Sequence, residues 1–164
     1  MPGIASSHGL QVQVTATESM AARARAYQQL YGWPTGVDRA TGRLVVAVST
    51  GLNAIAMRND LGIEIQSALS MQMLAGPVLA MPGEPADWVF LTGPASSVGA
   101  RALSDLSRLG VRLIPPGVFV PLPPSRLDSG MVRWTSGPTV GRELPPWTAV
   151  IAAVRSVSPT CSVR

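Results

Sequence analysis

Apolar residues recur at helical spacing in three parts of the chain. The first stripe follows Thr17-Glu18, a capping residue and an acid suited to a first helical turn, and it stops before Gly32 and Pro34. The other two stripes precede Gly76-Pro77 and Gly110. A fourth helix is indicated at Pro145-Pro146, because proline is tolerated in a first turn. The stripes consist of Met20, Ala24, Tyr27 and Tyr31; Leu61, Ile65, Leu69 and Met73; and Val98, Ala102, Leu106 and Leu109.

Shorter apolar runs of strand length lie between these helices. Residues 43–48 and 52–57 flank Ser49-Thr50-Gly51, which predicts a hairpin. Residues 78–81 and 88–92 predict two more strands. In residues 110–134, runs at 111–114 and 118–120 flank a Pro-Pro-Gly turn, and a proline-rich crossing leads to a third run that ends at Trp134. This region is expected to form one compact β unit.

The order of these elements predicts an α+β fold, with a mixed or mostly antiparallel sheet and helices packed on it. Residues 17–156 are expected to form a single domain, with no internal repeat. Residues 1–16, which include an alternating Val12 and Val14, are expected to be a strand or a tail, and residues 157–164 a C-terminal tail.

Composition excludes several classes of protein. Hydrophobic residues make up 46% of the 164 residues and charged residues only 13%, which excludes disorder throughout. The longest apolar run, Leu44–Val48, is far shorter than a membrane span, and no secretory signal is visible. We therefore expect a soluble cytoplasmic protein with no membrane partner.

Few residues in the chain could carry common kinds of chemistry. All 13 basic residues are arginine, which excludes lysine Schiff bases and a P-loop lysine. The single cysteine, Cys161, excludes an intramolecular disulfide, and the single histidine, His8, leaves no Ser-His-Asp triad and no zinc or haem ligand set. No cofactor is expected. The net charge of +4 is spread along the chain, so it indicates general attraction to anions and no specific partner.

Four short motifs occur in a recognisable order. They are a helix ending in Gly32-Trp33-Pro34, then Pro123-Pro124-Ser125, Gly130 to Arg133-Trp134, and Leu144-Pro145-Pro146-Trp147. With these motifs the chain resembles the N-terminal domain of the bifunctional DNA primase/polymerases, of the archaeo-eukaryotic primase type, over residues 21–155. This resemblance implies the fold of that family and an ancestry in phosphoryl transfer with two divalent cations held by carboxylates.

The chain departs from the family at the positions that matter for catalysis. The Asp-x-Asp of the family falls on Ala56, Met57 and Arg58, or on Asn53 and Ala56 in a shifted register. The family's histidine falls on Trp88 and its third acid on Arg112. A guanidinium within about 4 Å of a cation costs on the order of 4 kcal/mol per pair of unit charges at an effective dielectric of 20. We therefore expect no metal site and no catalysis of the family type.

Two candidate phosphate sites follow. Strand alternation puts Arg58 on one face with the small Ala54 and Ala56, and family-like pairing would bring Arg112 towards it, forming a positive pocket. The alternative is that these arginines pair with Asp60, Glu64 or Asp87. The second candidate is the helix start at Ser96, Ser97 and Arg101, where the alternative is a simple capped helix.

These observations leave two functions open. The first is a non-catalytic primase/polymerase-like domain that keeps a surface for nucleic acid, nucleotide or a replication-related partner. The alternative is a protein–protein interaction or oligomerisation module, which would show an exposed apolar patch. The segment 121–126 also matches the PxxPxR pattern of a polyproline ligand, but its flanking strands favour a structural crossing.

Overall fold

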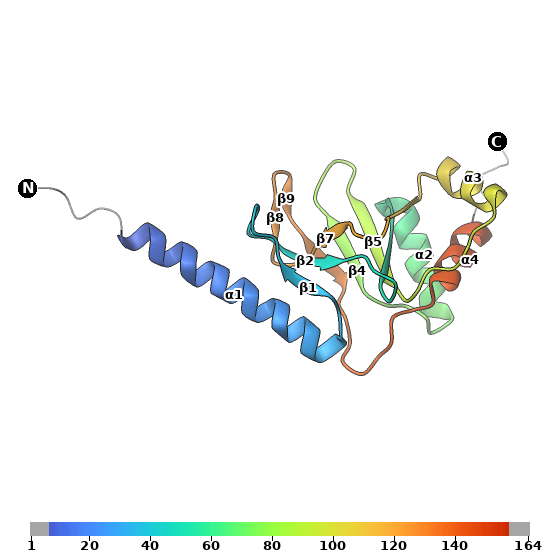
Figure 1. Cartoon of the computed structure of the whole chain (residues 1–164). Coiled ribbons are helices and arrows are strands. Elements are labelled where there is room, and N and C mark those ends of the chain that lie inside the picture. Colours follow the sequence, from blue (N-terminus) through green and yellow to red (C-terminus); the bar gives the residue numbers. More distant parts are fainter. Residues whose placement is uncertain (1–6, 158–164) are drawn as a thin grey trace, which may run out of the picture.

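The computed structural model of the chain describes residues 7–157, and describes side chains from residue 19 onward. Figure 1 shows the helices at the two sides of the molecule, with the strands between them. Helix α1 lies on one side, and α2, α3 and α4 lie on the other. Their bounds are α1 Ser7–Tyr31, α2 Asn59–Met71, α3 Ala100–Arg108 and α4 Trp147–Val157.

The strands form two antiparallel sheets and a small hairpin. The five-stranded sheet has the order β10-β4-β5-β3-β6, and the three-stranded sheet has the order β1-β2-β7. Strands β8 and β9 pair only with each other. This confirms the expected α+β fold. The bounds are β1 Thr35–Val37, β2 Leu44–Ala47, β3 Asn53–Arg58, β4 Val78–Met81, β5 Asp87–Thr92, β6 Arg112–Leu113, β7 Phe119–Pro121, β8 Arg126–Leu127, β9 Gly130–Met131 and β10 Arg133–Ser136.

Two hydrophobic cores lie on opposite faces of the five-stranded sheet. One fills the space between the two sheets and includes Ala54 and Ala56 from β3, Val46 from β2, and Ala24 from α1. The other lies under α2, α3 and α4 and includes Ile55 and Met57 from β3. Strand β3 is therefore buried on both faces, as is usual for a continuously apolar strand.

Helix α1 corrects the expectation for residues 1–16. The backbone is helical from Ser7, ten residues before the predicted start, so Val12 and Val14 lie in a helix and not in a strand or tail. Two valines at an i, i+2 spacing do not distinguish the two conformations. The predicted end is confirmed, because Tyr31 is the last helical residue and Gly32 takes a φ of 70°. Residues 1–6 and 158–164 lie outside the described residues.

The predicted hairpin of residues 43–57 is wrong. Strands β2 and β3 belong to different sheets, and the chain passes from one to the other through a turn closed by the Ser49 N–H donating to the Leu52 carbonyl. The predicted compact β unit of residues 110–134 is wrong for the same reason. Strand β6 joins one edge of the five-stranded sheet, β7 joins the three-stranded sheet, and β10 joins the other edge of the five-stranded sheet.

The strand predictions at 78–81 and 88–92 are confirmed, and the remaining helices fall close to their predicted ranges. Helix α2 ends at Met71, so Met73 lies beyond it and is exposed. No helix within residues 7–157 is both long enough and apolar enough to cross a membrane.

Candidate functional site

The register of β3 with its neighbours fixes where Arg58 and Arg112 lie. Ala56 stands opposite Arg112 of β6, and Arg58 stands opposite Asp87 of β5. Residues directly opposite in a sheet share a face, and residues two apart on one strand do so too. Arg58, Arg112 and Asp87 therefore lie on the same face, with Arg112 one pleat along from Arg58.

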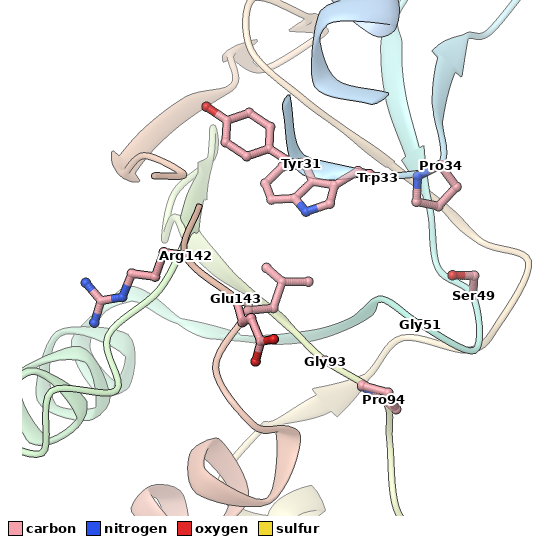
Figure 2. Close-up of a pocket in the computed structure, with 11 residues that line it drawn as sticks. Tyr31, Trp33, Pro34, Ser49, Gly51, Gly93, Pro94, Arg142 and Glu143 are labelled. Carbon is pink, nitrogen blue, oxygen red and sulfur yellow. The ribbon is translucent and has the colours of Figure 1, made fainter. Parts of the chain in front are cut away.

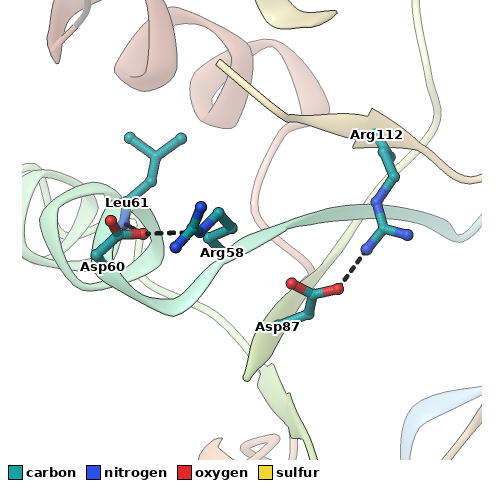
Figure 3. Close-up of polar contacts among 5 residues, drawn as sticks. All are labelled: Arg58, Asp60, Leu61, Asp87 and Arg112. Atoms are coloured by element: carbon teal, nitrogen blue, oxygen red, sulfur yellow. Dashed lines mark hydrogen bonds and ion pairs between the residues drawn. The ribbon is translucent and has the colours of Figure 1, made fainter. Parts of the chain in front are cut away.

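Each of these arginines has a carboxylate neighbour. Arg112 Nη2 donates to Asp87 Oδ2 at 2.5 Å, reaching across β3 to do so, and Arg58 Nε lies 4.0 Å from Asp60 Oδ1. Figure 3 shows the two guanidinium groups directed to these different acids. Both arginine side chains are 61% exposed, and exposed ion pairs of this kind contribute only about 0–1 kcal/mol. Of the alternative pairings expected from the sequence, the structure shows Arg58 with Asp60 and Arg112 with Asp87.

The space expected above Ala54 and Ala56 is absent. Both alanines are 2% exposed and form part of the core between the sheets, so no ligand can lie on them. Arg58 instead lines a smaller pocket of about 300 Å³ at the start of α2, together with Asp60, Glu64 and Arg108. This pocket contains two arginines and two acids, so its formal charge is balanced.

The second candidate site lies apart from the first. Helix α3 begins at Ala100 with Gly99 as its N-cap and has no side-chain capping hydrogen bond. A helix start capped by Ser96 or Ser97, the alternative to a phosphate site, is therefore wrong. Ser96, Ser97 and Arg101 are all exposed. The residue of α3 that lines the same pocket as Arg58 is Arg108, at the opposite end of the helix. At a rise of 1.5 Å per residue, Arg108 lies about 10 Å along the helix from Arg101.

The positions at which the resemblance would place metal ligands hold other kinds of side chain. Ala56 is core, Arg58 and Arg112 are cations, and the ring of Trp88 packs against Gly62 beneath α2. In the part of the chain that the structure describes, no three His, Cys, Asp or Glu side chains lie close enough to hold a metal ion.

Sequence reasoning did not identify a larger cleft of about 620 Å³, which we call the Trp33 cleft (Figure 2). Four separate segments line it: the end of α1, the β2–β3 turn, the loop after β5 and the segment before α4. Two of them contain motif residues evident in the sequence, Gly32-Trp33-Pro34 and Leu144, but only as marks of resemblance. The lining residues are Tyr31, Gly32, Trp33, Pro34, Ser49, Gly51, Gly93, Pro94, Arg142, Glu143 and Leu144.

A cluster of aromatic rings holds Trp33 at the top of this cleft. Tyr27 stacks on Trp33 with ring centroids 5.7 Å apart and an interplanar angle of 10°, and Tyr31 lies at 5.0 Å. Trp134 contacts the same ring, and its indole nitrogen donates to the Tyr27 hydroxyl at 3.2 Å. These contacts fix the Trp33 ring, which is 5% exposed.

The polar groups of the cleft differ in what they already bind. Arg142 donates to the Met73 carbonyl at the end of α2, at 3.1 Å. Within the described part of the chain, Glu143 makes no ion pair and the indole N–H of Trp33 has no hydrogen-bond partner. Figure 2 shows the Trp33 nitrogen on the edge of the ring that faces the opening.

Comparison with known proteins identifies no relative: no family model, no curated protein and no solved structure matches the chain.

Proposed function

We propose that this protein is a non-catalytic primase/polymerase-like domain that binds a phosphate-bearing ligand, a nucleotide or a single-stranded nucleic acid, at Arg58 and Arg112. The observation that carries this proposal is the strand register, in which Arg112 stands opposite Ala56 and so shares a face with Arg58. Each of these exposed guanidinium groups can donate two hydrogen bonds to a phosphate.

The same face supports the loss of catalysis. Two-metal phosphoryl transfer requires carboxylates at the positions where this chain has Ala56, Arg58 and Arg112. The one acid on the face, Asp87, already accepts a hydrogen bond from Arg112. A cation there would compete with a guanidinium for a single carboxylate, which does not make a metal site.

Binding at this face should be weak and sensitive to salt. A phosphate must displace Asp87 from Arg112 and compete with Asp60 for Arg58. Both pairs are exposed, so the cost of opening them is about 1 kcal/mol or less. Phosphate contacts also release counterions, so affinity falls steeply as salt rises.

The test is the affinity of a fluorescein-labelled oligothymidylate, measured by anisotropy at low salt. Arg58→Ala and Arg112→Ala should each weaken binding severalfold. Asp87→Asn should strengthen it, because it frees Arg112 for phosphate. Arg155→Ala is the matched control, since it removes an exposed arginine on α4 and changes the net charge equally. Equal weakening by all three arginine variants would reduce the interaction to general charge attraction and refute this site.

A second function, an interaction module, is favoured by the outer face of the three-stranded sheet. Val45 is buried yet belongs to neither core, and the neighbouring Phe119 is 62% exposed. Strand β2 is apolar on both faces, which is typical of strands that are covered on both sides. If this face forms an interface between two copies of the chain, the Phe119→Ser variant should have a lower sedimentation coefficient than the wild-type protein. An unchanged value would exclude self-association through Phe119.

A further inference from the structure

We propose that the Trp33 cleft is a separate binding site that accepts an extended peptide segment with a basic side chain. It takes a different ligand through different residues from those of the arginine face, the surface around Arg58 and Arg112, so either proposal can fail without the other. Three features support it: an unpartnered donor in a nearly buried side chain, an unpaired carboxylate, and apolar walls.

The donor is the indole N–H of Trp33. The ring is 5% exposed and held by Tyr27, Tyr31 and Trp134, so it cannot turn to find another acceptor. Its nitrogen has no partner among the described residues and lies on the edge that faces the cleft (Figure 2). The nitrogen itself is accessible from the cleft, because Gln66 Oε1 is the one buried side-chain polar atom without a partner among the described residues. A main-chain carbonyl of a bound peptide would accept this hydrogen bond.

The carboxylate is that of Glu143, which makes no ion pair within the described residues. Glu143 and Arg142 both line the cleft, and Figure 2 shows the Arg142 guanidinium directed away from the Trp33 ring. The guanidinium of Arg142 binds the Met73 carbonyl instead. Of the two charged residues in the lining, Glu143 is therefore the one without a partner among the described residues, which favours an arginine or lysine side chain and disfavours a phosphate.

The walls suit an extended chain. Pro34, Pro94 and Leu144 offer apolar contacts, and the volume of about 620 Å³ lies in the range of ordinary ligand sites. An extended segment rises about 3.3 Å per residue, so a tripeptide is about 10 Å long. Ser49 adds a hydroxyl at the rim, for which no hydrogen bond is present among the described residues.

The experiment follows the Trp33 indole resonance directly. The full chain is labelled with ¹⁵N, which gives four tryptophan indole cross-peaks. The Trp33 peak is the one that is lost in the Trp33→Phe variant. The probe is the capped tripeptide acetyl-Pro-Arg-Pro-amide, and the reference is acetyl-Pro-Gln-Pro-amide. The arginine peptide should shift the Trp33 indole peak saturably and bind roughly fivefold more tightly than the glutamine peptide, as expected for one exposed ion pair.

Substitution at Glu143 separates the two parts of the proposal. Glu143→Gln should bring the arginine peptide down to the affinity of the glutamine peptide. Glu64→Gln, an exposed acid that lines a different pocket, should change nothing. Unperturbed positions of the other three indole peaks show that each variant is folded.

Three results would overturn the inference. The first is no saturable shift of the Trp33 peak with either peptide. The second is equal affinity for the two peptides, which removes the basic side chain from the proposal. The third is a saturable shift with adenosine monophosphate that is at least as strong as that with the arginine peptide, which would make the cleft a nucleotide site.

Discussion

The indole ring of Trp88 lies directly against the backbone of Gly62. A Cβ placed on Gly62 would come within 2.8 Å of Trp88 Cε3 and 3.0 Å of Cδ2, closer than carbon atoms normally approach. Gly62 is buried near the start of α2, and Trp88 is on β5 beneath it. This contact packs helix α2 against the five-stranded sheet.

Gly62→Ala should destabilise the protein by about 1 kcal/mol. Overpacking a core contact costs roughly 1–3 kcal/mol, and alanine recovers about 1 kcal/mol of helix propensity. The rigid ring of Trp88 cannot move aside as a flexible side chain would. Urea unfolding measures the change, with Ser70→Ala on the exposed side of α2 as the control. A variant as stable as the control would mean that the helix shifts freely on Trp88.

Met73 occupies a position that normally suits glycine. Its φ is 58°, and the bonds Leu74 N–H to Leu69 carbonyl and Met73 N–H to Ser70 carbonyl form the Schellman pattern that ends a helix. A residue with a Cβ pays about 1–2 kcal/mol in this conformation. The exposed side chain, at 82%, recovers little of that cost through packing.

Met73→Gly should therefore raise the free energy of unfolding by about 0.5–1 kcal/mol. Met71→Gly is the matched control: it is the same residue type, equally exposed, and two residues earlier within α2. Glycine inside a helix loses backbone entropy, so that variant should lose about 0.5 kcal/mol. Thermal melts of both variants measure these effects. A change of melting temperature in the same direction for both variants would contradict the explanation from backbone conformation.

Magnesium or manganese should not bind at the arginine face. Arg58 and Arg112 are both cations, which repel a divalent ion. Titration with either metal, at ionic strength matched with sodium chloride, should shift neither the melting temperature nor the tryptophan fluorescence. Saturable binding at micromolar concentration would show that carboxylates elsewhere in the chain assemble a site.

Local signals in the sequence located most elements of the fold but not their partners. The stop of α1 at Gly32, the strands at 78–81 and 88–92, and the end of α3 before Gly110 all follow from local rules of spacing and backbone freedom. The pairing of β2 with β7 does not. It joins segments more than 70 residues apart, whereas Ser49-Thr50-Gly51 gave a local turn signal that suits a hairpin and a change of sheet equally.

In the candidate site, too, local features could be predicted from the sequence and contacts between distant segments could not. Strand alternation correctly predicts that Ala54, Ala56 and Arg58 share a face, because a period of two is local. It could not show that this face is covered by a second sheet, nor that Asp87 lies within reach of Arg112. The Trp33 cleft was missed because four segments that are distant in the sequence each contribute a few residues to it.

Ser125, the last residue of the Pro-Pro-Ser motif, connects the proline-rich crossing to the first residue of β2. Its hydroxyl donates to the Leu44 carbonyl and accepts from the Leu44 N–H, both at 2.9 Å, and the residue is buried. Leu122, three residues earlier, is buried as well. Segment 121–126 is therefore a structural crossing and not an exposed polyproline ligand.

Ser125→Ala should lower the free energy of unfolding by about 2 kcal/mol. The Leu44 carbonyl keeps a hydrogen bond from the Leu122 N–H, but the buried Leu44 N–H loses the partner that the hydroxyl provides. An unsatisfied buried donor costs roughly 1–3 kcal/mol. Ser129→Ala is the control, since its exposed hydroxyl also donates to a carbonyl, that of Pro82, yet water can replace it there, so a change below about 0.5 kcal/mol is expected. Equal losses in the two variants, measured by urea unfolding, would show that the crossing is held by its apolar contacts and not by the Ser125 hydroxyl.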